Sequence, residues 1–133
     1  MRQLRFLLLA LCVMFLTAQP LSAGIFFEAE TSGTFSTSGE PPLLTVDIIH
    51  TVDSSNPFQF ASMVAQQQAN VVTGEISDGT FTFTDVNNDT MFGTYSGFAV
   101  PRDPNNPVVL DVFSTFQVTG GTGQFAGLSF SGT

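Results

Sequence analysis

The sequence predicts an all-β protein: one domain over residues 24–133, folded as an antiparallel barrel or barrel-like meander of about seven to eight strands. Three observations lead to this prediction. Apolar and polar residues alternate over long stretches, as they do in half-buried strands. Threonine, valine and phenylalanine are frequent in these stretches, and they suit a pleated sheet better than a helix. Clusters of Gly, Pro, Asn, Asp and Ser separate the stretches.

Residues 1–23 have the pattern of a secretory signal peptide. Arg2 and Arg5 precede Phe6–Leu16, an unbroken apolar run of 11 residues, and small residues follow up to Ala23. As a helix this run would be about 16 Å long, roughly half the thickness of the hydrocarbon core, so we expect no stable membrane anchor. We expect cleavage after Ala23, with Ala18 as the alternative site, and a protein secreted to the extracellular space or the periplasm.

The remaining domain would be acidic and free of thiols. The only cysteine, Cys12, lies in the apolar run, so the domain can form no disulfide and depends on its core for stability. After residue 23, Arg102 is the only Lys or Arg, whereas all eleven Asp and Glu residues lie there. Such a surface repels phosphate, which argues against nucleic acid and anionic membranes as partners. We expect no cofactor.

The predicted strands are bounded by turn residues, and in several of them alternation defines an apolar face. They cover residues 25–37, 43–52, 71–77, 79–86, 90–100, 107–119 and 125–131. In Leu43–Asp53, alternation places Ile48, His50 and Val52 on one apolar face. Gly79–Asp85 sets two phenylalanines against threonines, and Pro107–Thr119 alternates over the longest stretch.

Two features of this region leave alternatives open. Residues 57–69 contain good helix formers after Pro57, but they also alternate, so they form either a helix or a strand. The tetrapeptide Gly-Thr-[Phe/Tyr]-[Ser/Thr] begins at Gly33, Gly79 and Gly93. Its irregular spacing argues against a solenoid and favours a recurring hairpin element.

A glycine-rich segment, Thr119–Gly127, follows the last long strand. It predicts a structural turn, after which Phe125 restarts a strand, because its glycines accept positive φ. These glycines are Gly120, Gly121, Gly123 and Gly127. A dinucleotide fingerprint would need a following helix and a second strand, and too few residues remain for both.

The runs Val118–Gly127 (VTGGTGQFAG) and Thr90–Gly97 (TMFGTYSG) resemble the small barrels related to allene oxide cyclases and plant dirigent proteins, and most of all their bacterial secreted relatives. The resemblance covers residues 71–133. It implies an antiparallel barrel of about eight strands with an apolar lumen, often oligomeric in the plant members. It carries over no catalytic or ligand-contacting residue. Since seven strands are predicted here, either the chain is truncated before a closing strand or residues 57–69 close the barrel.

Two polar residues are candidates for a catalytic role in a lumen. His50, the only histidine, could orient a ligand or act as a general base near neutral pH; the alternative is a hydrogen-bonded core histidine. Tyr95, the only tyrosine, could donate a hydrogen bond into the lumen or pack at its rim. The chain has no Gly-x-Ser-x-Gly sequence, so no serine triad is visible.

Two groups of carboxylates have spacings that occur at functional sites. Oxygen-bearing side chains at alternate positions resemble the start of a calcium loop: Asp85, Asn87 and Asp89. Thr90 stands where that loop needs glycine and Ser96 where it needs glutamate, so we favour an ordinary hairpin turn. Glu28 and Glu30 could cleave a glycosidic bond as a pair, but two carboxylates on one edge strand more often form a solvated face.

The sequence leaves three functions open. The first is a secreted small β-barrel module, without evident catalysis, that binds a small apolar ligand. The second is a cyclase- or isomerase-type barrel enzyme acting on an apolar substrate. The third is a structural cell-surface or matrix protein whose lumen is filled by its own phenylalanines. Each of these is compatible with a homo-oligomer.

Overall fold

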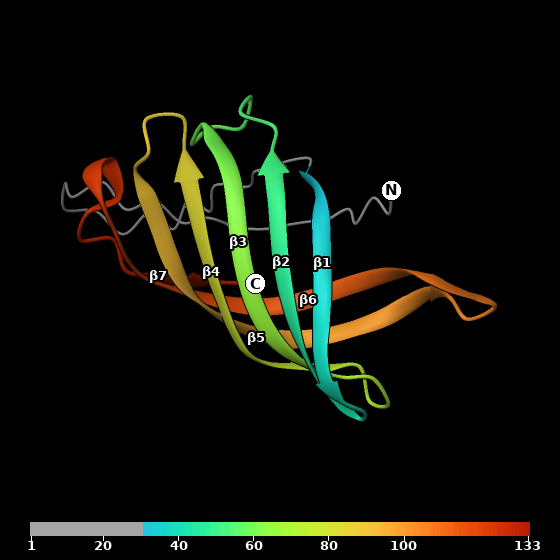
Figure 1. The fold of residues 1–133 in the computed structure, drawn as a ribbon. Coiled ribbons are helices and arrows are strands. Elements are labelled where there is room, and N and C mark those ends of the chain that lie inside the picture. The colour runs from blue at the N-terminus through green and yellow to red at the C-terminus, as the bar shows by residue number, and fades with distance from the viewer. Residues whose placement is uncertain (1–30) are drawn as a thin grey trace.

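The protein forms one curved antiparallel sheet (Figure 1). The structure, a computed structural model, describes residues 31–133, except for the side chains of residues 106–108. The predicted signal peptide 1–23, Cys12, the pair Glu28 and Glu30, and the beginning of the predicted strand 25–37 lie outside the described residues. The part of the chain that the structure describes holds no apolar helix of membrane-spanning length.

Seven strands follow one another in the sheet in chain order, each antiparallel to the next. They are β1 (Thr31–Glu40), β2 (Leu43–Val52), β3 (Phe60–Asn70), β4 (Glu75–Asp85), β5 (Thr90–Asp103), β6 (Asn106–Gly121) and β7 (Phe130–Gly132), with the short 3-10 helix η1 (Gly123–Phe125) before the last. The all-β prediction is confirmed. The sheet order has β1 at one edge and β7 at the other, so the fold is a barrel-like meander that does not close.

Residues 57–69 are not helical. Most of this segment is β3, which lies between β2 and β4 in the interior of the sheet. Phe60, Met63 and Ala65 are buried, whereas Val64 and Gln66 are exposed on the other side. The apolar alternation therefore decides the conformation, because pairing on both sides satisfies the backbone that a helix would otherwise satisfy internally. The segment does not serve as a barrel-closing strand.

The predicted strands 71–77 and 79–86 are wrong as two separate elements. Residues 71–74 form the turn after β3, in which the Asn70 side chain accepts hydrogen bonds from the backbone N–H groups of Val72 and Thr73 at 3.0 and 3.1 Å. β4 then runs without interruption past Asp78, whose φ of 50° marks an irregularity in the pairing with β5. The pair Asp78-Gly79 predicts a turn but forms an irregularity within one strand, because Asp and Gly are typical of both bulges and turns.

The predicted strand 125–131 is shorter than expected. Phe125 does not restart a strand but lies in η1, and its side chain is only 3% exposed. Its ring centroid is 5.3 Å from that of Phe60, so the segment folds over the core before it rejoins the sheet. β7 consists of three residues, paired with Phe116–Val118 of β6.

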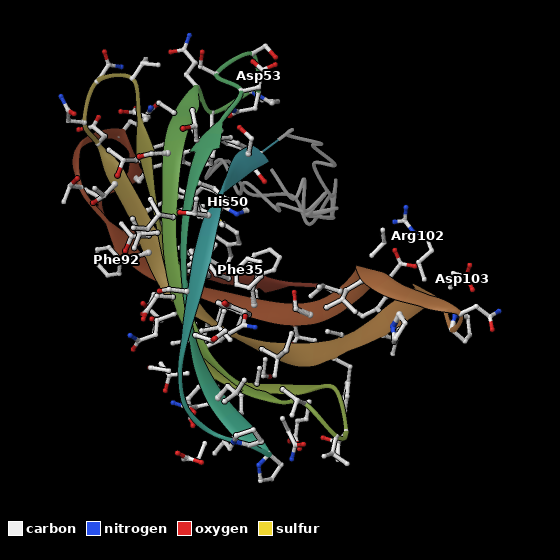
Figure 2. All side chains as sticks on the ribbon, turned by 45° about the vertical axis from the view of Figure 1, so that its right-hand side comes forward. Phe35, His50, Asp53, Phe92, Arg102 and Asp103 are labelled. Carbon is white, nitrogen blue, oxygen red and sulfur yellow. The ribbon has the colours of Figure 1, made fainter. Side chains whose placement is uncertain are left out.

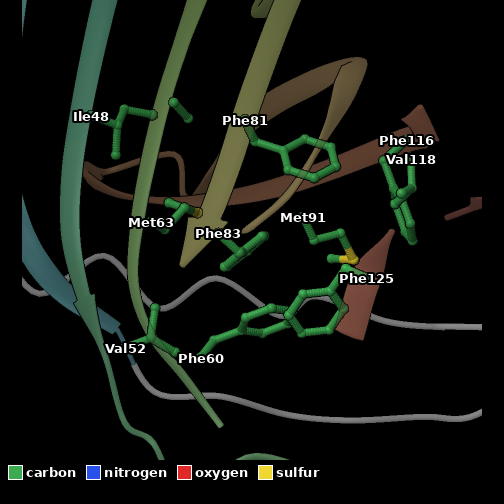
Figure 3. Packing of buried hydrophobic residues seen from close by; sticks show 11 residues of the cluster. Ile48, Val52, Phe60, Met63, Phe81, Phe83, Met91, Phe116, Val118 and Phe125 are labelled. Atoms are coloured by element: carbon green, nitrogen blue, oxygen red, sulfur yellow. The ribbon is translucent and has the colours of Figure 1, made fainter. Parts of the chain in front are cut away.

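The hydrophobic core fills one end of the concave face. Phe60, fully buried, packs against Phe83 with 4.8 Å between ring centroids and against Phe125 on its other side. Figure 3 shows these rings close to Met91, with Phe125 contributed by η1. The cluster consists of Ile48, Val52, Phe60, Met63, Ala65, Phe81, Phe83, Met91, Phe116, Val118 and Phe125.

The recurring glycine motif lies within strands rather than in hairpins. Each of its glycines faces a ring on the neighbouring strand: Gly33 faces His50, Gly79 faces Tyr95, and Gly93 faces Phe81. A Cβ atom at Gly93 would lie 2.8 Å from Phe81 Cζ and would collide with the Gln117 carbonyl oxygen. A Cβ atom at Gly79 would lie 2.8 Å from the Tyr95 ring. The motif therefore lets rings lie against the backbone of the next strand, a feature that allows a sheet to bend.

Replacing Gly93 should therefore destabilise the domain. We expect Gly93→Ala to lower the free energy of unfolding by about 1–3 kcal/mol, because either the Phe81 ring or the β6 backbone must move. Urea unfolding followed by far-UV circular dichroism measures the change. Thr94→Ala, the next residue on the exposed side of β5, is the matched control and should change stability by less than about 0.5 kcal/mol. Equal stability of the two variants would contradict this role of Gly93.

Candidate functional site

Beside the core, the concave face forms an open cavity of about 630 Å3. β1 and β2 supply one wall, and the hairpin of β5 and β6 supplies the other. Figure 2 shows this hairpin extending crosswise to β1, and Phe35 projecting from β1 into the hollow. Leu110 and Val112 line the opposite wall. The volume of this cavity and its mostly apolar lining fall in the range of small-molecule pockets.

The hairpin carries its charges at its tip and on its outer face. Arg102 and Asp103 lie far from the body of the sheet (Figure 2). The Arg102 guanidinium Nε donates to Asp111 Oδ1 at 2.9 Å, and this carboxylate raises the pKa of Arg102. The inner face of the same hairpin presents apolar residues to the cavity, among them Ala99 and Pro101.

His50 occupies the position that alternation predicts. It lies on the same face as the buried Ile48 and Val52, is only 3% exposed and lines the cavity. Its Nδ1 atom is 3.0 Å from Thr31 Oγ1, and a Cβ atom at Gly33 would lie 2.5 Å from its ring. Burial lowers the pKa of His50, so the imidazole is neutral at pH 7.

Tyr95 lines the other side of the cavity. Its hydroxyl group donates a hydrogen bond to Gln67 Oε1 at 2.6 Å. Burial raises the pKa of Tyr95 to about 12, so the phenol stays protonated at neutral pH. Sequence reasoning missed Gln67. Alternation from Met63 through Ala65 places Gln67 on the same face, but this pattern has meaning only if residues 57–69 form a strand.

The two candidate residues thus lie apart in the cavity wall. His50 belongs to β2 and Tyr95 to β5, and β3 and β4 lie between these strands. Neutral imidazole, phenol and amide groups can orient a bound molecule by hydrogen bonds.

Asp85 is the last residue of β4, and Asn87 and Asp89 lie in the turn that leads to β5. Asp85, which is 2% exposed, accepts hydrogen bonds from the N–H groups of Asn87 and Asp89, both at 2.8 Å, and from Gln124 Nε2. Burial alone would raise the pKa of Asp85, but the hydrogen bonds from Asp89, Gln124 and Asn87 outweigh it and lower the pKa. Within residues 31–133, no three His, Cys, Asp or Glu side chains gather closely enough to hold a metal ion. Asp85 and Asp89 join this turn to η1, because their carboxylates accept hydrogen bonds from Gln124, whereas Asn87 bonds within the turn.

The four glycines expected in one turn have two roles. Gly123 and Gly127 have positive φ, 53° and 76°, and they form the turn around η1. Gly120 and Gly121, expected in the same turn, instead lie at the end of β6, paired with Phe92 and Met91 of β5. A Cβ atom at Gly120 would lie 2.9 Å from Phe92 Cζ, so this glycine accommodates a ring.

No protein-family model, curated protein or solved structure matches the chain.

The hydrogen bonds of Asp85 predict a loss of stability in acid. Because the pKa of Asp85 is lower in the folded protein, its stabilising effect is complete above the unfolded pKa of about 3.9 and disappears as the pH falls through the folded value. Asp85→Ala should lower the melting temperature at pH 7 by about 5–10 °C and reduce its further fall below pH 4.

Calorimetry at pH 7 and pH 3 measures both effects. Glu40→Ala, at an exposed position, is the control and should melt close to the wild type at pH 7. An Asp85→Ala variant that melts at the wild-type temperature at pH 7 would contradict the structural role of this carboxylate.

Proposed function

We propose that this protein is a secreted binding module that holds a small apolar molecule in the concave cavity and does not transform it. The observation that carries the proposal is the apolar cavity of about 630 Å3 between the β1–β2 side of the sheet and the hairpin of β5 and β6. A ligand gains about 25 cal/mol for each Å2 of apolar surface that it removes from water, and this wall offers few other interactions. The predicted signal peptide supports a secreted location.

The distribution of phenylalanines supports binding over a purely structural role. Phe60 and Phe125 pack together at one end of the sheet and do not line the cavity, whereas Phe81 and Phe83 of the same cluster do. Phe35 remains 44% exposed although it projects into the hollow, so its ring is available to a bound molecule (Figure 2). A protein that used its aromatic residues only for packing would fill this space.

One observation supports the enzyme alternative, a cyclase or isomerase acting on an apolar substrate. His50 and Tyr95 both line the cavity, and each can exchange hydrogen bonds with a bound molecule. We favour binding because the two side chains come from strands separated by β3 and β4, and the hydrogen bonds described for each lead to Thr31 and Gln67 rather than to a shared reacting point.

Filling the cavity should abolish binding. N-phenyl-1-naphthylamine, a neutral probe that fluoresces in apolar surroundings, should bind the wild-type protein with one saturable site. Val46→Trp adds an indole to the lining of the cavity and should raise the dissociation constant at least about tenfold. Fluorescence titration measures the binding, and circular dichroism verifies the fold.

Ile49→Trp is the matched control, since Ile49 lies on the same strand, on the outer face, and is 62% exposed. It should bind the probe as the wild type does. Absence of saturable binding to the wild type, or an equal loss in both variants, would refute the proposed function.

A further inference from the structure

Resting on this proposed function, we infer that the ligand is electrically neutral: an apolar molecule with a hydroxyl or carbonyl group, and not a carboxylate such as a fatty-acid anion. The inference concerns the same cavity and adds the class of molecule that it accepts.

The cavity wall carries no formal charge among the described residues. Its polar members are hydroxyl, amide and imidazole side chains, and none of them is Asp, Glu, Lys or Arg. Because burial keeps Tyr95 protonated and His50 neutral, this wall remains uncharged at pH 7. A buried anion without a partner would lose its hydration and gain no ion pair, at a cost of several kcal/mol.

The charges around the cavity disfavour an anion as well. From residue 31 onward the chain has nine of its eleven Asp and Glu residues, all but Glu28 and Glu30, and a single basic side chain of the Lys or Arg type, Arg102. That guanidinium is paired with Asp111 on the outer face of the hairpin. The field of the described domain therefore repels anions, and its one arginine is already neutralised. A cation would be attracted from a distance, but it would meet no carboxylate in the wall.

The hydrogen-bonding groups of the wall suit one neutral oxygen atom. The Tyr95 hydroxyl donates its hydrogen to Gln67 Oε1, so the phenol oxygen retains lone pairs that can accept. Gln67, the partner of Tyr95 in this hydrogen bond, carries two further N–H donors on its Nε2 atom. A ligand hydroxyl can accept from the amide and donate to the phenol, and a ligand carbonyl can accept from the amide. Both groups lie in a mostly apolar lining, which suits a mostly hydrocarbon molecule.

Two probes that differ by one charge test the inference. N-phenyl-1-naphthylamine is neutral, and 8-anilino-1-naphthalenesulfonate has the same rings with an added sulfonate. We expect the sulfonate to bind the wild-type protein at least about tenfold more weakly at pH 7. In competition with the neutral probe, 1-dodecanol should displace it, and dodecanoate should do so at least about tenfold less effectively.

A cation placed in the wall should change this preference. Leu110 lines the cavity and is half-buried, so Leu110→Lys introduces an ammonium group there. This variant should bind the sulfonate severalfold more tightly than the wild type does. Val109→Lys, one position away on the exposed side of β6, adds the same charge outside the cavity and should leave the affinity near the wild-type value.

Each outcome has a distinct meaning. Equal affinities of the wild type for the two probes, or equal gains from the two lysines, would overturn the inference of a neutral ligand and leave the binding function standing. If neither probe binds the wild-type protein, the proposed binding function itself is refuted.

Discussion

The fold depends on the packing of rings against glycines across neighbouring strands. At Gly79 and Gly93 a side chain would collide with the facing ring, so only glycine allows Tyr95 and Phe81 to lie on the inner face as they do. Bulges in the pairing of β3 with β4 and of β4 with β5 add to the bending. The resulting curvature gives the seven-stranded meander a concave face with an open cavity, because it brings the hairpin of β5 and β6 opposite β1.

Curvature without closure leaves part of the concave face open, and core residues such as Ile48, Met63 and Phe83 also line the cavity there. At one end, η1 places Phe125 on Phe60, and the core is tightly filled. At the other end, the walls remain apart, and the same kinds of side chain line a cavity. The core and the proposed binding cavity thus share one face of one sheet. One polar group of the cavity wall, the Tyr95 hydroxyl, has its partner on the neighbouring wall residue Gln67.

From the alternation of apolar and polar residues, the sequence predicted the strands and the side chains on their inner face. It placed His50 on the inner face, and it indicated strands rather than helices for most of the chain, since period two is a local property. It left residues 57–69 open because Ala and Gln favour helices when neighbouring strands are ignored. It predicted a break between strands at Asp78 and a strand at Phe125, where the structure has a bulge and a 3-10 helix. Bulges, turns and 3-10 helices contain similar residues, so the sequence does not separate them. The roles of Gln67, Gly79 and Gly93 follow from contacts between strands, which no single segment reveals.

A nuclear Overhauser measurement between a bound neutral probe and the methyl groups of the sheet tests the binding face most directly. We expect contacts from N-phenyl-1-naphthylamine to Val46, Ile48 and Met63, which line the cavity. We expect none to Ile49 and Val64, which are exposed on the outer face of the same strands. Contacts to the outer methyl groups, or none to the inner ones at saturation, would show that the curved inner face does not hold the ligand.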